Sequence, residues 1–593
     1  MGGVMAYLFL CSLGPVQEFI VNARRSRDLW YGSWMLSELA KAVAKKIATS
    51  GGTLVFPKPV NSGDLDAKSD FNSPNRVSAV FELFDYQLAD SFKQAAKERL
   101  FELWNDSLVH IQDQAKFQNV SPTDLFTDAT IPKQQIEDLL EFYWVAVPFE
   151  QGAYPKARDQ AEALLAARKN TRDFELDDGS NVPKSSLDGI RESVIPEEFY
   201  KKPYDPAQKL YKLYRARGAE RLSGVDLLKR LGRLGDEPKF ASTSDVAAAP
   251  LMSTLDGGKQ KNLIDGLKKL LTDEGVLADE ISENASLIFE SRFREYLGEN
   301  TNQKEILQHY HDRLKKTFDG ANPYPYYALL IADGDNMGEL INQLPDIKSH
   351  SLLSQKLSQF AAHLPLQIEK DYSGTCIYAG GEDILAYLPL HKALDFASKL
   401  EGDFKAAILT TLSGGLVIAH HLTPLNEVMQ LAREAEKESK KHLPRESEKE
   451  SKKHLPQEAE KESKKTVSKN ALTVVLSKRS GTETVITDNW EQLTDRLMVL
   501  KDWIKAGLLG QGVGYELKVL ADDFGGFDLH NNKSHRDALA NEAIRIIERK
   551  RESNSTIPLT SDVKDQLRKW IETNNIPVAQ LANEIIVASE FTN

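Results

Sequence analysis

The chain has 593 residues, of which 41% are hydrophobic and 27% charged, as in globular proteins, and its length requires several domains rather than one core. Its formal net charge of -12 at pH 7 excludes a protein that grips nucleic acid alone by neutralising phosphates, although a local basic patch or a partner subunit could supply such contacts. The two cysteines, Cys11 and Cys376, exclude a cysteine-based zinc site, and the lack of a membrane-length apolar run leads us to expect a cytoplasmic protein without membrane contact.

The N-terminal segment, residues 1–194, alternates apolar runs with helical patterns. Tyr7–Leu13 reads as a first strand rather than a signal peptide, because no basic region precedes it. Helices are expected over Val16–Arg24 and Trp30–Ile47. Further strands are expected at Thr53–Phe56, Val77–Leu83 and Phe142–Val147. The first strand ends in Gly14-Pro15 instead of acidic residues, so we predict a palm-like unit without metal ligands.

Residues 195–320 are mostly helical in pattern and show no catalytic constellation, which predicts a helical linker domain. The pair His311-Asp312 is isolated there, without the further His and Asp ligands that a nuclease metal site needs. We therefore expect a surface pair and no nuclease site in this domain.

The segment 321–487 follows the order β-α-β-β-α-β, which is that of a ferredoxin-like palm. Its expected elements are a strand at Tyr327–Ala332, a helix at Ser351–Ile368, hairpin strands at Thr375–Ala379 and Ile384–Leu388, a helix near His391–Leu400, a strand at Leu412–Ala419, a helix from Pro424 and a strand at Leu472–Leu476. Residues 488–593 are helical in pattern, with Asp488 or Asn489 as the first cap. We therefore predict an α+β protein with two ferredoxin-like palm/cyclase domains, the first degenerate, a helical domain between them and a helical C-terminal domain.

Two acidic motifs lie at strand ends of this palm. Asp333-Gly334-Asp335 follows its first strand, and Gly380-Gly381-Glu382-Asp383 forms the hairpin turn. Carboxylates at adjacent strand ends repel one another unless cations lie between them, and two Mg²⁺ or Mn²⁺ ions carrying the triphosphate of ATP meet this need. The alternative is a pair of acidic turns without metal.

The expected roles follow from this chemistry. We expect Asp333, Glu382 and Asp383 to be catalytic, and metal ligands to come from these residues, the Gly334 carbonyl and Asp335. Asp335 could instead hold the next helix through Asn336. Nucleotide contacts are expected from Asn336, Gly380, Gly381 and Lys478, since the two glycines let phosphates approach the backbone and Lys478 ends a palm strand.

A twelve-residue repeat interrupts the palm. Glu436-Lys437-Glu438-Ser439-Lys440-Lys441-His442-Leu443-Pro444 recurs from Glu448 and starts again at Glu460. A unit this short that contains proline cannot stack as a solenoid. We expect a tandem duplication over 436–465 inserted at the surface, as a solvated helix extension or loop; a functional basic arm is the alternative.

Two further groups of residues have open roles. Arg24, Arg25 and Arg27 lie at one end of a predicted helix and could contact the phosphates of RNA or ATP, or pair with acidic neighbours at the surface. His420-His421 follows a palm strand, where a structural role is favoured over contact with a nucleotide base.

The two acidic motifs, in the form Tyr-Tyr-Ala-Leu-Leu-x-x-Asp-Gly-Asp-Asn-Met-Gly and Tyr-Ala-Gly-Gly-Glu-Asp, resemble those of the large polymerase/cyclase subunit of type III CRISPR effector complexes. Gly14–Ile20 and Ala23–Ser33 resemble the Cmr, or III-B, branch of that family. The segments Ser73–Arg76, Tyr143-Trp144, Lys184–Gly189 and Lys478–Gly481 fit the same family. The resemblance thus spans most of the chain.

The resemblance implies that target RNA activates the complex to convert ATP into a cyclic oligoadenylate messenger. It also implies partners, namely other Cmr-type subunits and, through the complex, guide CRISPR RNA and target RNA. On the resemblance alone, Ser33 is expected to contact ATP. The chain departs from the family in three ways: Glu382 replaces the usual Asp, the N-terminal HD nuclease domain of many members is not expected, and the cysteines of the usual zinc site are missing.

Three alternatives remain open from the sequence. The same palm could join ATP to another acceptor, such as S-adenosylmethionine. The chain could be a catalytically silent scaffold of the RNA-guided complex, although its acidic motifs are intact. A stand-alone diguanylate-type cyclase is disfavoured by the additional palm and helical domains.

Overall fold

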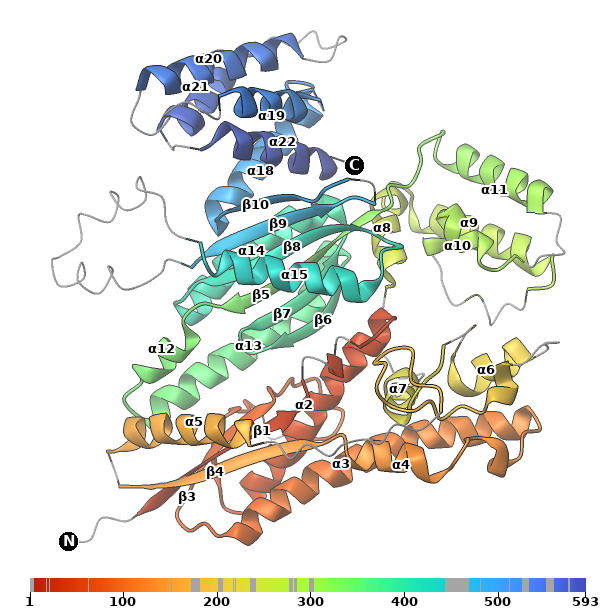
Figure 1. Ribbon diagram of the computed structural model, residues 1–593, viewed down its shortest axis with the longest axis vertical. Coiled ribbons are helices and arrows are strands. Elements are labelled where there is room, and N and C mark those ends of the chain that lie inside the picture. Colours follow the sequence, from red (N-terminus) through yellow and green to blue (C-terminus); the bar gives the residue numbers. More distant parts are fainter. Residues whose placement is uncertain are drawn as a thin grey trace.

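The computed structural model describes residues 5–16, 19–20, 22–61, 63–150, 152–171, 182–200, 206–216, 218, 220–234, 241–276, 281, 285–297, 303–442, 469–479, 481–510, 512–524, 533–550, 559–573 and 576–592. Two sheets lie one above the other in Figure 1, with helices of the linker beside them and the C-terminal helices at the opposite end from the N-terminal sheet. The predicted α+β architecture with two palm-like domains is confirmed.

The N-terminal sheet consists of β1 (Ala6–Gly14), β2 (Thr53–Phe56), β3 (Arg76–Phe81) and β4 (Glu141–Phe149), in the antiparallel order β2-β3-β1-β4. Alternate residues of β1 enter two cores, as a strand buried on both faces requires. Phe9 and Cys11 pack with α2 (Ser26–Thr49) and α3 (Tyr86–Phe117), whereas Leu8 and Leu10 pack with α5 (Tyr154–Asn170).

The second palm-like domain has six strands in the order β10-β9-β8-β5-β7-β6. They are β5 (Tyr326–Gly334), β6 (Thr375–Gly380), β7 (Asp383–Leu388), β8 (Leu412–His420), β9 (Ala471–Ser477) and β10 (Thr484–Asn489). Within it, the order β8-β5-β7-β6 repeats the strand order β4-β1-β3-β2 of the N-terminal sheet, so the predicted architectural repeat is confirmed. β8 and β9 are parallel, and the other neighbours are antiparallel.

Helices cover both faces of this sheet. α13 (Ile347–Tyr372) and α14 (Leu390–Ile408) pack on Ala328, Leu330 and the other side chains of one face. α15 (Leu425–Ser439) packs on the opposite face, to which Tyr327 and Leu329 point and against which α2 also lies. Pro424 is the N-cap of α15 rather than a residue of its first turn.

Several boundaries differ from the predictions. β5 continues through Gly334, so Asp333 lies within the strand, and the short helix α12 (Met337–Asn342) and strand β10 were not predicted. The helix expected over Trp30–Ile47 starts earlier, at Ser26. Of the segment expected to form a helix over Val16–Arg24, Gln17, Glu18 and Val21 lie outside the described residues, and residues 19–20 are helical. The later part of the tandem repeat, residues 443–465, also lies outside them.

The linker and the C-terminal domain are helical, as predicted. The linker contains α6 (Pro206–Tyr214), α7 (Gly224–Leu231), α8 (Thr243–Met252), α9 (Gly257–Thr272), α10 (Glu290–Arg294) and α11 (Gln303–Thr317). The C-terminal domain contains α18 (Trp490–Lys505), α19 (Val513–Asp523), α20 (Lys533–Arg549), α21 (Ser561–Arg568) and α22 (Val578–Glu590). Asn489 caps α18 by accepting from the Gln492 amide, at 3.2 Å. Over the described residues, none of the helices combines the length and the apolarity needed to cross a bilayer.

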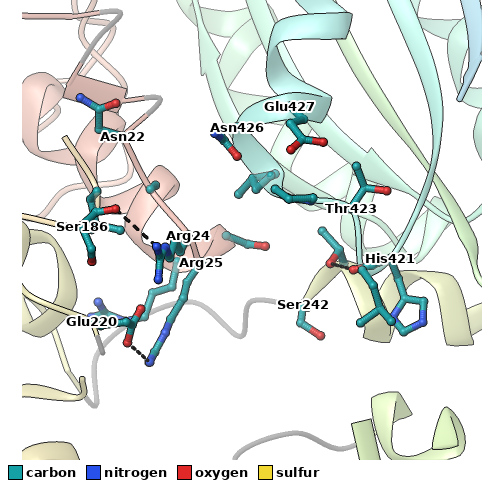
Figure 2. A pocket seen from close by; sticks show the side chains of 18 of the residues that line it. Asn22, Arg24, Arg25, Ser186, Glu220, Ser242, His421, Thr423, Asn426 and Glu427 are labelled. Atoms are coloured by element: carbon teal, nitrogen blue, oxygen red, sulfur yellow. Dashed lines mark hydrogen bonds and ion pairs between the residues drawn. The ribbon is translucent and has the colours of Figure 1, made fainter. Parts of the chain in front are cut away.

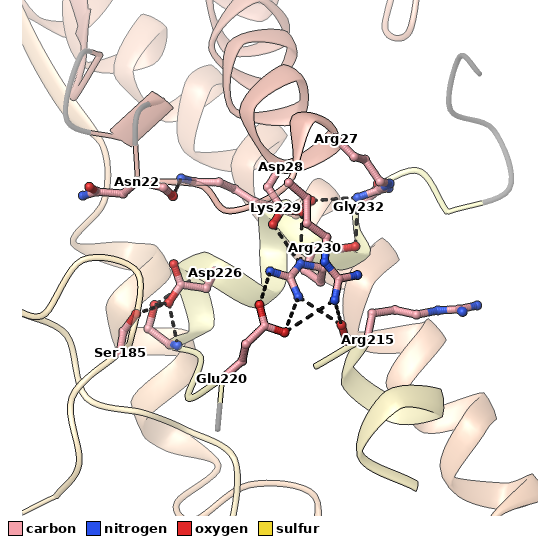
Figure 3. Close-up of polar contacts among 12 residues, drawn as sticks. Asn22, Arg27, Asp28, Ser185, Arg215, Glu220, Asp226, Lys229, Arg230 and Gly232 are labelled. Atoms are coloured by element: carbon pink, nitrogen blue, oxygen red, sulfur yellow. Dashed lines mark hydrogen bonds and ion pairs between the residues drawn. The ribbon is translucent and has the colours of Figure 1, made fainter. Parts of the chain in front are cut away.

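A buried ionic network fastens the linker to the start of α2 (Figure 3). The Arg230 guanidinium, 1% exposed, donates to Asp28 at 2.8 Å and lies 3.3 Å from Glu220. Arg25 pairs with Glu220 at 3.4 Å, and Arg27 donates to the carbonyl oxygens of Lys229, Arg230 and Gly232. Because buried charges need such partners, this network fixes how α7 is placed against α2.

Candidate functional site

The strand register brings the two acidic motifs together. Ala332 of β5 pairs with Ile384 of β7, so the next residues outward, Asp333 and Asp383, oppose each other. By strand alternation both point to the face covered by α15 and α2. The hairpin closes at Gly381, whose φ of +69° favours glycine, and no atom lies within 4 Å of where its Cβ would be.

Gly334 makes room for the hairpin turn. A Cβ at this position would lie 2.8 Å from the Cβ of Glu382 and 2.9 Å from the Cγ of Met337. Gly334 itself remains in the strand, paired with Leu412, and the chain turns afterwards at Asn336, which has a φ of 54°. The turn therefore starts after Gly334, and the glycine allows the close approach of Glu382.

The carboxylates perturb one another. Burial raises the pKa of Glu382, and the negative charge of Asp333 raises it further. The pKa of Asp383 is raised well above its ordinary value, mainly by loss of hydration. Its hydrogen bond to Asp333 and the negative charges of Asp333 and Glu382 raise the pKa further. The Asp383 side chain nevertheless stays accessible to solvent, so a ligand from solution can reach it. Such like-charge crowding favours cation binding.

Two residues missed from the sequence complete this cluster. Glu436 adds a further negative charge near Asp383, and the Lys440 ammonium contacts Asp333 and lies 2.5 Å from Glu436. Both belong to the first copy of the repeat, which was expected to be solvated. Val428, Met429, Ala432 and Ala435 pack against the sheet at helical spacing, and this pattern could have placed the repeat's first residues beside it.

The donor set suits hard divalent cations. Asp333, Glu382, Asp383 and Glu436 offer carboxylate oxygens, the ligands that Mg²⁺ and Mn²⁺ prefer, beside the open space over Gly381. Over the part of the chain that the structure describes, no three acidic, histidine or cysteine side chains converge tightly enough to form a preassembled cation site. Lys440 supplies positive charge at Asp333 instead.

Asp335 lies directly after the end of β5, where it joins three strands. It is fully buried, and its Oδ2 accepts from the Thr411 hydroxyl and from the Asn470 amide, both at 2.7 Å. These bonds tie the end of β5 to the starts of β8 and β9. Asp335 therefore anchors the sheet through Oδ2, whereas its buried Oδ1 has no hydrogen-bond partner among the described residues, and its role as a metal ligand stays a prediction. Asn336 caps α12 without a side-chain hydrogen bond.

Ser33 and Lys478 differ in their placement. Ser33 is 4% exposed within α2, the helix that lies against the same sheet face as the carboxylates, and its contact with ATP stays a prediction. Lys478 follows β9, and because β9 is parallel to β8, it lies at the end of the sheet occupied by His420, opposite to Asp333. It pairs there with Glu590 at 2.8 Å. The expectation that Lys478 neutralises a triphosphate at the acidic motifs is therefore corrected: the lysine at these motifs is Lys440.

The N-terminal domain contributes to the same face. The Asn72 side-chain amide donates to the Ala379 carbonyl oxygen, at 3.1 Å, just before the hairpin turn. Arg76, paired with Glu162 at 2.6 Å, is close enough for its charge to lower the pKa of Glu382. A substrate at the carboxylates would thus meet residues of both palm-like domains.

A second group of contacts holds the N-terminal domain against α12 and α13. Arg158 of α5, 4% exposed, donates to the carbonyl oxygens of Ile341 and Asn342, at 2.6 and 3.0 Å. The Tyr154 hydroxyl lies 2.7 Å from Nδ1 of His350. Burial, and then the charge of Arg158, lowers the pKa of His350 to about 4, so the imidazole is neutral at neutral pH.

A cavity of about 890 Å³ lies at the other end of the palm sheet (Figure 2). Arg24, Ser186, Ser242, His421 and Glu427 line it. Asp333 lies seven residues along β5 from Tyr326, which pairs with His420, a distance of roughly 23 Å. The cavity is therefore separate from the carboxylate cluster.

The arginines and histidines at this end are largely engaged in packing. Arg25 and Arg27 belong to the ionic network at α2, whereas Arg24 is exposed and donates to the Ser186 carbonyl oxygen at 3.4 Å. His421 is buried, stacks on Phe289 with 4.2 Å between ring centroids, and lies 2.8 Å from the Ser244 hydroxyl, which supports the structural role favoured for it. His311 pairs with Glu290 at 3.1 Å on the exposed side of α11.

Comparisons with known proteins agree on one family. The family model described as "Cas10/Cmr2, second palm domain" matches residues 326–449, and that of "CRISPR-associated protein Cmr2, N-terminal" matches residues 8–107. The Cmr subunit Cmr2 of Pyrococcus furiosus is 23% identical over 579 residues, an alignment that covers 80% of this chain and 62% of the relative. The chain thus spans less than two thirds of that relative's length.

Solved structures share the fold. A cryo-EM structure of the type III-B Cmr-beta complex bound to cognate target RNA contains a chain that matches with a TM-score of 0.65 at 14% identity, covering 99% of this chain and 83% of that one. The apo state of Cmr-beta matches with a TM-score of 0.61 at 15% identity, covering 94% and 78%.

Proposed function

This chain belongs to the Cas10/Cmr2 family of type III-B CRISPR systems, and we propose that its catalytic palm is a metal-dependent nucleotidyl transferase that makes cyclic oligoadenylate from ATP. One observation carries the proposal: Asp333 and Asp383 oppose each other on adjacent strands, with Glu382 brought close by the missing side chain of Gly334. The perturbed pKa values of Glu382 and Asp383 agree with a site that functions with added cations.

The reaction is an in-line displacement. The 3′-oxygen of one adenosine forms a bond to the α-phosphorus of the next ATP, the bond to the bridging oxygen of pyrophosphate breaks, and the hydroxyl proton passes to solvent. Two Mg²⁺ or Mn²⁺ ions, when bound, neutralise the triphosphate and activate the attacking oxygen. Asp333 and Asp383 would hold the ions, with Glu382 and Glu436 beside them. Gly381 leaves room for a phosphate, whereas a Cβ on Gly380 would lie 2.0 Å from the Tyr378 hydroxyl oxygen, so that glycine makes room for Tyr378.

The two palm-like domains would each contact one of the two reacting nucleotides. Asn72 and Arg76 of the N-terminal domain lie beside the hairpin, where a second nucleotide must be held so that its hydroxyl faces the first. We infer that the chain acts as the large subunit of an effector complex with other Cmr-type subunits, guide CRISPR RNA and target RNA, and that target RNA starts the synthesis. The fold shared with the Cmr-beta chains supports this assignment.

A catalytically silent scaffold is the second candidate. The contact between Lys440 and Asp333 favours it, because an ammonium group neutralises the carboxylate that a metal ion would use. The crowded carboxylates favour the enzyme, since a scaffold gains nothing from their mutual repulsion.

The test uses the assembled complex with target RNA, Mg²⁺ or Mn²⁺ and ATP, with or without S-adenosylmethionine, and identifies products by mass spectrometry. We expect 3′–5′-linked cyclic oligoadenylate from the wild type and none from the double variant Asp333→Ala, Asp383→Ala. Glu339→Ala, which removes an exposed carboxylate of α12, is the matched control and should keep full activity. A wild-type complex without nucleotide product would support the scaffold, and a sulfonium conjugate would change the acceptor.

A further inference from the structure

We propose that Lys440 is a built-in counter-cation of the carboxylate site and that divalent metal must displace its ammonium group from Asp333. The inference rests on the metal dependence of the proposed function and deepens it, because it makes metal loading a competition with a residue of the chain itself.

The contacts of Lys440 place it at the centre of the acidic cluster. Its Nζ donates to Oδ2 of Asp333 and lies 2.5 Å from Oε1 of Glu436. Asp333 also neighbours Asp383 across the strand pair and raises the pKa of that residue. An ion bound between Asp333 and Asp383 would therefore share the Asp333 carboxylate with the Lys440 ammonium group.

Charge repulsion sets the two cations in competition at Asp333. Its carboxylate has two oxygens with about four lone-pair sites, so the number of acceptor sites alone does not exclude joint binding. An ammonium group and a divalent ion on this one carboxylate would, however, bring two positive charges within a few ångströms of each other in a partly enclosed site. Metal loading is therefore expected to weaken the Lys440 contact, and the contact to weaken metal binding.

The position of Lys440 in α15 allows the exchange. Lys440 is the C-cap residue, and its side chain is 29% exposed, so the flexible four-carbon stem can turn toward solvent without moving the packed part of the helix. Glu436, one helical turn earlier and 18% exposed, can keep the ammonium after it leaves Asp333. The pair thus offers Lys440 a second resting position on its own helix.

The next residue provides a matched control. Lys441 carries the same charge, but its side chain is 72% exposed and pairs with Glu438 at 3.1 Å, away from the cluster. Changes at Lys441 therefore report the effect of net charge on metal binding, and any additional effect at Lys440 reports the contact with Asp333.

The experiment measures Mn²⁺ binding to the full chain without nucleotide, by titration calorimetry and by the electron paramagnetic resonance signal of free Mn²⁺. Lys440→Gln should bind Mn²⁺ about tenfold more tightly than the wild type, because the competing cation is gone. Lys440→Arg should stay within about threefold of the wild type because it keeps the charge, and Lys441→Gln should stay within about twofold. Thermal unfolding of each variant checks that the fold is kept.

Two results would overturn the inference. Equal or weaker Mn²⁺ binding by Lys440→Gln would show that the ammonium does not compete, and an equal gain in Lys441→Gln would assign the effect to net charge. Failure of the proposed function is distinguishable: tighter binding by Lys440→Gln together with no nucleotide product from the assembled complex would uphold the competition and refute the enzyme.

Discussion

Replacing Gly334 by alanine tests whether close approach of the hairpin sets the catalytic geometry. The new Cβ would lie 2.8 Å from the Cβ of Glu382, so the hairpin must move by at least about 0.6 Å to reach an ordinary 3.4 Å contact. Overpacking of this size costs about 1–3 kcal/mol of stability. Because Asp383 follows Glu382 directly, the shift also separates it from Asp333, and a misplacement near 1 Å can cost roughly 100-fold in rate.

The assay compares Gly334→Ala with Gly338→Ala. A Cβ on Gly338 meets no atom within 4 Å, and alanine in this exposed helical position stabilises by up to about 1 kcal/mol. We expect a lower thermal midpoint and a 10- to 100-fold lower rate of product formation for Gly334→Ala, with neither change for Gly338→Ala. A Gly334→Ala complex that keeps its rate within twofold would refute the argument that this contact sets the site.

Three further predictions concern buried polar contacts. Arg496→Met should lower the free energy of unfolding in urea by about 3–5 kcal/mol, because it leaves the buried carboxylates of Asp488 and Glu584 without their cation. Arg545→Met breaks an exposed ion pair and should cost less than about 1 kcal/mol, and equal losses in the two variants would refute this prediction. Because the pKa of His350 is lowered to about 4 in the folded protein, up to about 3 kcal/mol of the free energy of unfolding is lost as the pH falls from 6.5 toward 4. The difference in free energy of unfolding between wild type and His350→Asn should therefore decrease on acidification. A difference that stays constant with pH would contradict this. Arg158→Met should lower the thermal midpoint by leaving the partly buried carbonyl groups of Ile341 and Asn342 without their donor, a loss of about 1–2 kcal/mol, and should speed proteolysis between the two palm-like domains; unchanged cleavage would show that Arg158 does not hold α12 in place.

Strands with continuous apolar runs were predictable from the sequence, because burial on both faces leaves little ambiguity. Thr53–Phe56 has the predicted bounds, and the hairpin strands differ by one residue at most at each end. β10 was missed because it is an edge strand with polar positions, so its pattern resembles a loop.

The positions of Asp333 and Asp383 could be predicted from their place at the ends of adjacent strands. The positions of Lys478 and Lys440 were not predicted correctly, because they depend on the direction of β9 and on the packing of α15. The opposition of Asp333 and Asp383 follows from adjacent strands, as expected. Lys478 was assigned to the wrong end, although the parallel β8-α15-β9 crossover could have shown that β9 finishes away from Asp333. Lys440 was missed because the high charge of the repeat indicated a solvated segment, whereas the first copy of the repeat continues the packed helix α15.

The Arg158 contacts with α12 make the N-terminal domain a mechanical part of the proposed site. α12 starts at Met337, three residues after the end of β5 at Gly334, and its six residues span about 9 Å, with the Arg158 contacts at its last two residues. A tilt of the N-terminal domain at this contact would move α12, and because α12 is short, the movement would reach Asp333 at the end of β5. A subunit or RNA that binds the N-terminal domain and rotates it could thus shift Asp333 through α12 and change the rate of the proposed reaction, without contacting the carboxylates.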